Sequence, residues 1–191
     1  KTRLGYNKDM LDEWLPALLK AEPAAIIIHA RTRKEMSKVP ARWERVKRAV
    51  EIRDEMKSET LIIGNGDLWG IEDAREKIKA SGADGAMLGR AIFGKPWLFA
   101  STELASHSPS AADGVGVHVQ QVPPPLGERL RIAVEHSKLF EELLGDIKNF
   151  AIMKKHFKAY CEGFPGAKEL RVKLMETHSA AGVEGVIEGF L

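Results

Sequence analysis

The chain has 191 residues, of which 29 are Lys or Arg and 27 are Asp or Glu, and 44% of the residues are hydrophobic. This hydrophobic content is enough to build a core, which excludes a globally disordered chain. The single Cys excludes both an intramolecular disulfide framework and a zinc site made of cysteines. The longest uninterrupted apolar run, residues 24–28, is too short to cross a membrane, and no signal peptide is visible.

Helical and strand-like patterns alternate in the first half of the chain. Three short apolar runs each end abruptly in Gly or polar residues, which predicts parallel strands covered on both faces. The apolar spacing between them predicts amphipathic helices, and Gly82 is a suitable residue to end the third helix. This alternation predicts an α/β fold. In chain order the expected elements are a helix over 11–20, a strand over 24–29, a helix over 43–56, a strand over 60–65, a helix over 71–81 and a strand over 85–89.

The second half of the chain has a different character. Residues 106–126 are rich in Pro, Gly and Ser and carry one charged residue, Asp113, which predicts a flexible or extended linker. Only helical patterns follow, over 129–144, 147–161, 167–179 and a short end from Val183. We therefore expect three parts. They are an α/β part over 1–105, the linker over 106–126 and a small all-helical domain over 127–191.

Polar residues follow all three predicted strands. His29 ends the first strand, Asn65-Gly66-Asp67 the second, and Gly89-Arg90 the third. Ligands of α/β folds bind at the carboxyl ends of parallel strands, so these residues predict a ligand site. Each glycine pair alone is explained by a tight turn. Together, with Arg90 adding charge, they favour a phosphate site.

Basic residues are concentrated in two segments of this nearly neutral chain. Residues 31–48 hold eight Lys or Arg against two Glu, and residues 148–173 hold seven against two. Such segments indicate a surface for a polyanion, although a solvated charged face is the alternative. His29 is followed by Arg31 and Arg33, which favours an anionic or hydrogen-bonding ligand beside it. Cys161, in the helical part, is expected to be a half-buried helix residue.

Several motifs follow one another along the chain: residues 1–5, 29–33, 40–43, Ile63-Gly64-Asn65-Gly66-Asp67, Leu88-Gly89-Arg90-Ala91, Pro96-Trp97 and 165–171. In this order they resemble the tRNA-dihydrouridine synthases, FMN-dependent enzymes that reduce uridine in tRNA. The helical part resembles that family's C-terminal tRNA-binding bundle. The resemblance covers nearly the whole chain except the linker.

The resemblance implies a fold, a reaction and roles for individual residues. The fold would be the C-terminal portion of a TIM (β/α)8 barrel, strands six to eight, followed by the helical domain. NADPH would reduce FMN, which would then reduce a flipped-out uridine to 5,6-dihydrouridine. The residues implied to contact the cofactor are Lys1, His29, Asn65, Gly66, Asp67, Gly89 and Arg90. Those implied to contact tRNA are Arg31, Arg33, Lys154, Lys155, Lys158, Lys168 and Arg171.

One family motif, the Asn-x-Gly-Cys-Pro that carries the catalytic acid, is absent from these 191 residues. Cys161 has no such context, so we expect no catalytic residue here and no activity from the chain alone. We expect the intact enzyme to be a monomeric cytoplasmic protein that needs neither membrane nor metal. Two alternatives remain open: a non-catalytic RNA-binding module, and another FMN barrel oxidoreductase that acts on a small molecule.

Overall fold

The computed structural model describes residues 1–99 and 124–191, which form two compact units, Lys1–Ala91 and Ile92–Leu191. The linker expected over 106–126 therefore lies outside the described residues except for its last three positions. Each unit has a hydrophobic core of its own. Within the described ranges, no helix has the length and apolar character needed to cross a membrane.

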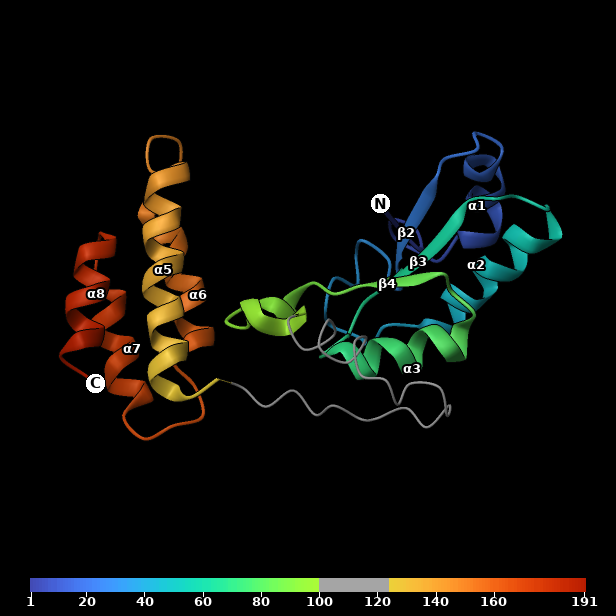
Figure 1. Ribbon diagram of the computed structural model, residues 1–191. Coiled ribbons are helices and arrows are strands. Elements are labelled where there is room, and N and C mark those ends of the chain that lie inside the picture. Colours follow the sequence, from blue (N-terminus) through green and yellow to red (C-terminus); the bar gives the residue numbers. More distant parts are fainter. Residues whose placement is uncertain (100–123) are drawn as a thin grey trace, which may run out of the picture. The chain divides into compact units, whose positions relative to one another are not determined.

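The first unit is an α/β unit built on a four-stranded parallel sheet in the order β1-β2-β3-β4 (Figure 1). The three predicted strands and three predicted helices of this half are confirmed, with ends shifted by one or two residues. A fourth strand, β1, is too short for a periodic pattern to reveal it. The elements are β1 (Thr2–Arg3), α1 (Leu11–Leu19), β2 (Ala25–His29), α2 (Trp43–Glu55), β3 (Leu61–Asn65), α3 (Ile71–Ser81) and β4 (Gly85–Met87).

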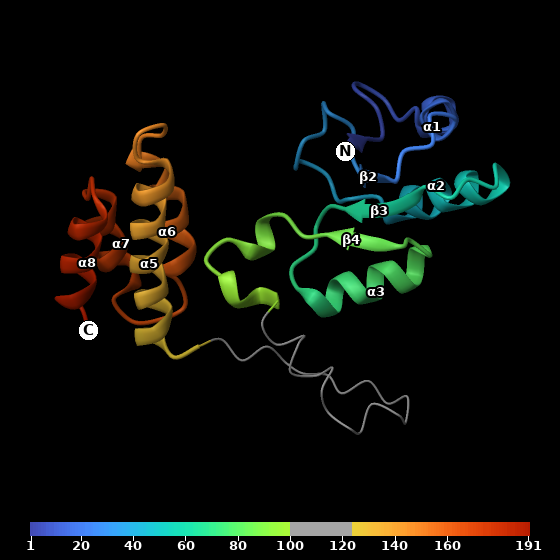
Figure 2. The same cartoon turned by 45° about the horizontal axis from the view of Figure 1, so that its top comes forward.

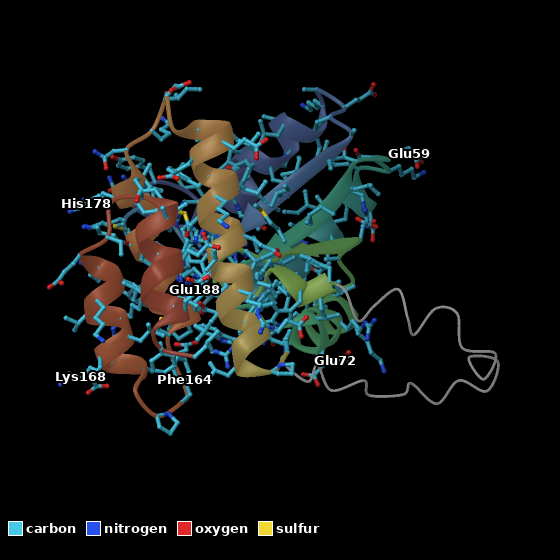
Figure 3. The ribbon with its side chains drawn as sticks, turned by 60° about the vertical axis from the view of Figure 1, so that its left-hand side comes forward. Glu59, Glu72, Phe164, Lys168, His178 and Glu188 are labelled. Carbon is cyan, nitrogen blue, oxygen red and sulfur yellow. The ribbon has the colours of Figure 1, made fainter. Side chains whose placement is uncertain are left out.

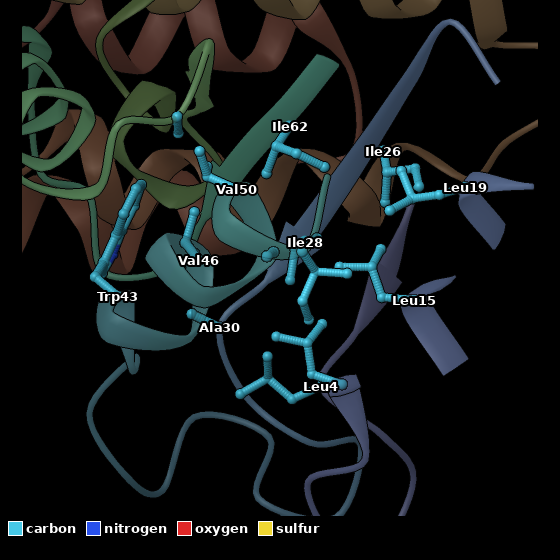
Figure 4. Packing of buried hydrophobic residues seen from close by; sticks show 14 of the residues in the cluster. Leu4, Leu15, Leu19, Ile26, Ile28, Ala30, Trp43, Val46, Val50 and Ile62 are labelled. Carbon is cyan, nitrogen blue, oxygen red and sulfur yellow. The ribbon is translucent and has the colours of Figure 1, made fainter. Parts of the chain in front are cut away.

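The core of this unit lies between one face of the sheet and the helices (Figures 2 and 4). Ile28 and Ile62 on the strands are fully buried against Leu15 of α1 and Val46 of α2. The expectation of strands covered on both faces is not met here. Side chains on the other face of β2 and β3, such as Ile27, are only partly buried. The sheet therefore has a helix-covered face and a more open face.

Gly82 ends α3 as expected. It adopts the left-handed conformation with φ of 72°, and its N–H donates to the carbonyl oxygen of Ile78 at 2.8 Å. A residue without a Cβ adopts this conformation at little cost, so the helix stops and the chain turns into β4.

The second unit is helical. Its core includes Leu130, Phe157, Tyr160 and Leu174, all fully or almost fully buried. Its elements are η2 (Pro96–Phe99), a short turn, and then α5 (Leu126–Leu144), η4 (Phe150–Met153), α6 (Lys154–Tyr160), α7 (Ala167–Met175) and α8 (Ala180–Glu188). Another short turn, η1 (Arg90–Ile92), spans the boundary between the two units in the sequence.

The helix predicted over 147–161 differs from the observed one. Asn149 is extended, and its Oδ1 accepts a hydrogen bond from the backbone N–H of Ala151 at 2.8 Å. This cap starts a 3-10 turn at Phe150, and the α-helix begins only at Lys154.

Residues 92–99 pack with the helical unit, although the sequence suggests an α/β part that runs to residue 105. Gly94 has a φ of 69° and lies against the backbone of α6, where an added Cβ would be 2.6 Å from the carbonyl carbon of Ala159. Only a glycine allows this approach, so this segment is fitted to the helices.

Candidate functional site

Strand register brings the predicted polar residues into one row. Arg3 pairs with His29, His29 pairs with Asn65, and Asn65 pairs with Met87 across the four strands. Each of these four residues is the last residue of its strand: Arg3 of β1, His29 of β2, Asn65 of β3 and Met87 of β4. A parallel sheet places such ends along one edge, where α/β folds bind their ligands.

Asn65 ties several strands together at this edge. Its Oδ1 accepts a hydrogen bond from Lys1 Nζ at 2.7 Å, and its Nδ2 donates to the carbonyl oxygen of Met87 at 2.7 Å. Lys1 directly precedes β1, so the side chain of Asn65 links the segments on both sides of β2 and β3. Burial, and to a smaller extent the charge of Arg3, lowers the pKa of Lys1.

Arg31 and Asp67 form the most buried charged contact of the site. Arg31 is 3% exposed, its Nη2 lies 2.5 Å from Asp67 Oδ2, and its Nε donates to the carbonyl oxygen of Val39 at 2.6 Å. Asp67 also accepts from the Ala41 amide at 2.8 Å and from Arg90 Nη2 at 3.3 Å. Asp67 is thus held by two arginines and one backbone amide.

The charge state of Asp67 follows from these contacts. Burial by itself raises the pKa of this carboxyl. Hydrogen bonds from Arg31 and the Ala41 amide, together with the charges of Arg31 and Arg90, outweigh burial and hold the pKa below its usual range. Asp67 is therefore ionised at neutral pH.

His29 is neutral at pH 7. Burial, and then the positive charges of Arg3, Lys1 and Arg31, lower the pKa of its imidazole to about 4. Arg31 Nη1 lies 3.4 Å from His29 Nε2. Because a guanidinium can only donate, Nε2 accepts and the ring proton resides on Nδ1. His29 can thus donate a hydrogen bond from Nδ1 without adding charge.

The backbone of the loop after β3 has an uncommon shape. Gly66 has a φ of 127° and Asp67 a φ of 48°, both in the left-handed region. An added Cβ on Gly66 would lie 2.8 Å from the Cβ of Ala41 and 3.2 Å from the ring of His29. Glycine is therefore required at position 66 for both its conformation and its surroundings.

These residues surround a pocket of about 140 Å³. At its rim the Arg90 side chain is 56% exposed and its guanidinium lies 5.5 Å from the centre of the Trp69 ring. A Cβ on Gly89 would meet no atom within 4 Å, so the backbone there is open to an approaching group. The lining residues are His29, Arg31, Ser37, Asn65, Gly66, Asp67, Leu68, Trp69, Met87, Gly89 and Arg90.

The pocket fits a phosphate group. Arg90 offers exposed guanidinium N–H donors, and the glycine backbone permits close approach. The one carboxylate in the pocket, Asp67, is already matched by Arg31 and Arg90. The phosphate site that the two glycine loops predict would therefore correspond to this pocket.

A second, wider pocket of about 650 Å³ shares His29 with the first. It is strongly cationic, because Lys1, Arg3 and Arg33 line it together with Tyr6 and Trp14. Of the two arginines predicted to contact the substrate, Arg33 is exposed here, while Arg31 is buried in the first pocket. The structure thus separates two residues that the sequence suggests act together.

Half of the eight basic residues in the segment 31–48 are paired with carboxylates, and all of those carboxylates except Glu35 lie outside the segment. Arg31, Arg42, Arg45 and Arg48 all form ion pairs. These pairs compete with a polyanion, so the charge count of this segment overstates its surface potential. Their carboxylate partners are Asp67 for Arg31, Glu35 for Arg42, Asp9 and Asp12 for Arg45, and Asp12, Glu51 and Glu55 for Arg48.

The basic segment 148–173 is different. Within residues 1–99 and 124–191, none of its seven Lys and Arg residues forms an ion pair. Lys155, Lys158 and Lys168 are exposed, and Figure 3 shows Lys168 at the outside of α7. Lys154 and Arg171 are partly exposed. These basic side chains therefore keep their positive charge available.

Cys161 is more buried than expected. It is 1% exposed at the end of α6, and burial raises the pKa of its thiol to about 11, although Arg171 and Arg129 act in the opposite direction. The thiol is therefore protonated and covered. In the part of the chain that the structure describes, no group of three or more His, Cys, Asp or Glu side chains is arranged to hold a metal ion.

Sequence reasoning alone assigns no role at the first pocket to Trp69, Ser37 or Trp43, although Trp43 belongs to the motif at 40–43. Trp69 and Ser37 line this pocket, and Trp43 donates to the carbonyl oxygen of Gly66 from beneath it. Trp69 follows Asp67 by two positions, and that proximity is a signal that could have identified it. Ser37 has no such signal.

Comparisons with known proteins agree with this geometry. A family model described as dihydrouridine synthase matches residues 1–188. A Staphylococcus aureus (strain Mu50) protein named "Probable tRNA-dihydrouridine synthase" is 35% identical over 192 residues, which cover 100% of this chain and 53% of that protein.

Two further relatives match this chain with similar identity and coverage. A Staphylococcus epidermidis (strain ATCC 12228) protein of the same name is 36% identical, over 100% of this chain and 53% of that protein. The Bacillus subtilis (strain 168) "Probable tRNA-dihydrouridine synthase 2" is 35% identical, over 100% and 54%. The chain thus spans about half the length of the curated relatives it matches.

Proposed function

This chain belongs to the dihydrouridine synthase family, and from that membership we propose that it is part of an FMN-dependent enzyme that reduces uridine to 5,6-dihydrouridine in tRNA with NADPH. Members of this family are flavin-dependent oxidoreductases with a TIM-barrel fold. The observation that supports the proposal most is the pocket in which Asn65, Asp67 and Arg90, all from family motifs, meet at the strand ends.

In this proposal the first pocket receives the phosphate of FMN. Arg90 would bind the phosphate, the backbone at Gly66 and Gly89 would approach it, and Arg31 would hold Asp67 in place. Arg31 thereby acts in the cofactor pocket, which differs from the tRNA contact that the resemblance implies. Bound FMN would supply hydride-transfer chemistry to the uracil ring.

The second pocket would face the reacting end of the cofactor and the substrate. His29 lines both pockets, and Lys1 lines the second while it donates to Asn65 of the first, so both residues would contact the flavin ring. A lysine ammonium stabilises negative charge on such a ring, and neutral His29 can donate from Nδ1. Arg33, exposed in this pocket, would contact the tRNA backbone.

The helical unit would bind tRNA through its unpaired basic residues. Phosphate contacts of this kind supply affinity without sequence selection. The residues proposed for this contact are Lys154, Lys155, Lys158, Lys168 and Arg171.

The catalytic acid would come from outside these residues. The Asn-x-Gly-Cys-Pro motif does not occur in the 191 residues, and the thiol of Cys161 is buried in the helical unit. We therefore propose that the chain corresponds to the C-terminal part of the barrel with the helical domain, is inactive alone, and acts in the cytoplasm.

Two binding experiments and one assay test the proposal. FMN should bind the 191-residue chain with an affinity that falls about tenfold in Arg90→Gln, because one charge-assisted contact is worth roughly 1.5 kcal/mol. With unmodified tRNA and NADPH, the chain alone should form no dihydrouridine. Turnover by the isolated chain would contradict the assignment of a missing acid.

The second binding experiment measures how the affinity for tRNA depends on salt concentration. The double variant Lys154→Gln/Lys158→Gln should bind tRNA more weakly and reduce the slope of log affinity against log salt by about two, roughly one for each phosphate contact. Lys138→Gln is the matched control, because Lys138 in the same unit is paired with Glu184 at 2.6 Å. An equal loss of slope per lysine removed in both variants would argue against a specific role for the unpaired lysines.

A non-catalytic RNA-binding module is the second candidate, favoured by the unpaired lysines of the helical unit. It predicts salt-dependent tRNA binding by a chain that binds no FMN. The flavin titration separates the two candidates.

A further inference from the structure

We propose that Trp43, at the start of α2, is a positioning residue that fixes the segment 64–67, the end of β3 together with the loop after it, in its phosphate-binding shape. This inference rests on the proposed function, because it assumes that the loop receives the phosphate of FMN. It concerns the geometry of the loop rather than a direct contact with the ligand. Trp43 is not among the residues that line the pocket.

The indole of Trp43 is fitted closely to the end of β3. The side chain is 8% exposed, and its Nε1 donates a hydrogen bond to the carbonyl oxygen of Gly66 at 2.9 Å. An added Cβ on Gly64 would lie 2.3 Å from the indole ring, so the ring occupies the space beside that glycine. Figure 4 shows Trp43 at one side of the core cluster, next to Val46. One side chain therefore contacts this segment at two alternate positions.

The residues before Trp43 hold the same segment by backbone contacts. The Ala41 amide donates to Asp67 Oδ2 at 2.8 Å, and the Ala41 Cβ faces the α-carbon of Gly66 closely enough to exclude a side chain there. The Arg42 amide donates to the carbonyl oxygen of Ala30 at 2.8 Å, and the Ala30 amide donates to the carbonyl oxygen of Asn65 at 2.9 Å. The residues before α2 are thus bonded to this segment directly and through Ala30, just past β2.

These contacts account for the shape of the loop. Gly66 and Asp67 both have positive φ, and for Asp67 that conformation is uncommon and needs support. The support comes from the Ala41 amide and Arg31 on the carboxylate and from Trp43 on the preceding carbonyl group. Because hydrogen bonds of this kind fix backbone orientation, they also fix where the glycine backbone meets a phosphate.

A simpler view is that Trp43 only fills the core. Phenylalanine would fill most of the same volume, but it has no N–H and would leave the buried carbonyl oxygen of Gly66 without its donor. Trp43→Phe therefore separates the two roles. Trp97→Phe is the matched control, because Trp97 is a partly buried indole that packs in the helical unit.

The first test compares FMN with riboflavin, which has the same ring system but no phosphate. In Trp43→Phe we expect FMN affinity to fall about tenfold while riboflavin affinity changes less than twofold, and Trp97→Phe to change neither. A fall of equal size for both ligands, or an unchanged FMN affinity, overturns the proposal, since a purely structural role does not act through the phosphate.

The second test needs no ligand and uses amide hydrogen exchange followed by NMR on the 191-residue chain. We expect the Trp43 indole N–H to exchange at least tenfold more slowly than that of Trp69, which is 65% exposed. In Trp43→Phe the Ala41 amide should exchange faster, while the Ile62 amide, bonded to Asp84, should not change.

The two tests distinguish failure of this inference from failure of the proposed function. If the wild-type chain binds neither flavin, the FMN proposal fails, and the exchange rates alone decide the role of Trp43. Equal exchange of the Trp43 and Trp69 indoles would show that the hydrogen bond to Gly66 does not hold the loop, which overturns the inference.

Discussion

Lys1 Nζ donates to Asn65 Oδ1 at 2.7 Å, although the two residues are separated by 64 positions in the chain. The amide of the same Asn65 donates to the carbonyl oxygen of Met87. One neutral side chain therefore orients the ammonium proposed to contact the flavin and anchors it to β4. The acceptor and donor halves of a carboxamide do different tasks here, which a carboxylate cannot reproduce.

Replacement of Asn65 by Ala should remove both hydrogen bonds and destabilise the α/β unit by about 1–2 kcal/mol, since each bond is worth roughly 0.5–1.5 kcal/mol. Asn65→Asp should lie between Ala and wild type, because it keeps an acceptor for Lys1 but loses the donor to Met87. Urea unfolding followed by circular dichroism measures the difference. An Ala variant as stable as wild type would show that these contacts are dispensable.

Asp67→Asn should be among the more damaging single changes in this unit. It leaves the guanidinium of Arg31, 3% exposed, without its counter-charge, and breaking a buried pair costs about 3 kcal/mol. Asp12→Asn is the control. Asp12 also pairs with two arginines but is 47% exposed, so its loss should cost less than about 1 kcal/mol. Unfolding in urea should rank the variants in this order, and the reverse order would refute the reasoning.

The stability of the α/β unit should depend on the charge of His29. Its pKa is 6.5 when unfolded and about 4 in the folded chain, so between these values the unfolded chain binds a proton that the folded site does not. The contribution of His29 is therefore complete above pH 6.5 and is lost as the pH falls through about 4.

Two measurements check this pH dependence. NMR titration of the imidazole should give a midpoint near 4 with the proton on Nδ1 at neutral pH. His29→Gln should show a smaller loss of urea stability between pH 6.5 and 4.5 than wild type. A midpoint near 6.5 would mean that burial and the neighbouring cations do not act on His29 as described.

Gly94→Ala should destabilise the helical unit by about 3 kcal/mol. The new Cβ would lie 2.6 Å from the Ala159 backbone, and the left-handed conformation costs a further 1–2 kcal/mol or so. Gly163→Ala is the matched control, because Gly163 has a φ of 77° but no atom within 4 Å of an added Cβ. Thermal unfolding should therefore show a clearly larger shift for position 94. Equal shifts would indicate that the contact with Ala159 relaxes freely.

Local sequence patterns predicted the secondary structure of the α/β unit well, because each strand and helix there is encoded by its own apolar spacing. The features that these patterns do not predict are a very short strand and a helix start that is set by a single cap. Strand β1 has only two residues, and the start of α6 is set by the cap at Asn149. Neither feature produces a periodic signal.

Charge was harder to interpret from the sequence. A count over residues 31–48 cannot include Asp9, Asp12 and Asp67, which lie outside that window and pair with its arginines. For the same reason the burial of Arg31 was not predictable, since its partner is 36 residues away. The turn after β3 is easier to predict from sequence, because its shape depends on Gly66 and Asp67, which are adjacent in the chain.

The ion pairs of Asp67 bear on whether the α/β unit can fold before it binds an anion. A site built only from arginines would repel itself until an anion arrived, and would depend on that anion to fold. Asp67 is a resident counter-ion for Arg31 and Arg90, so the α/β unit can reach its final shape first. The phosphate proposed to bind here would then share Arg90 with a carboxylate that is already in place, and its release would leave that carboxylate paired with Arg31.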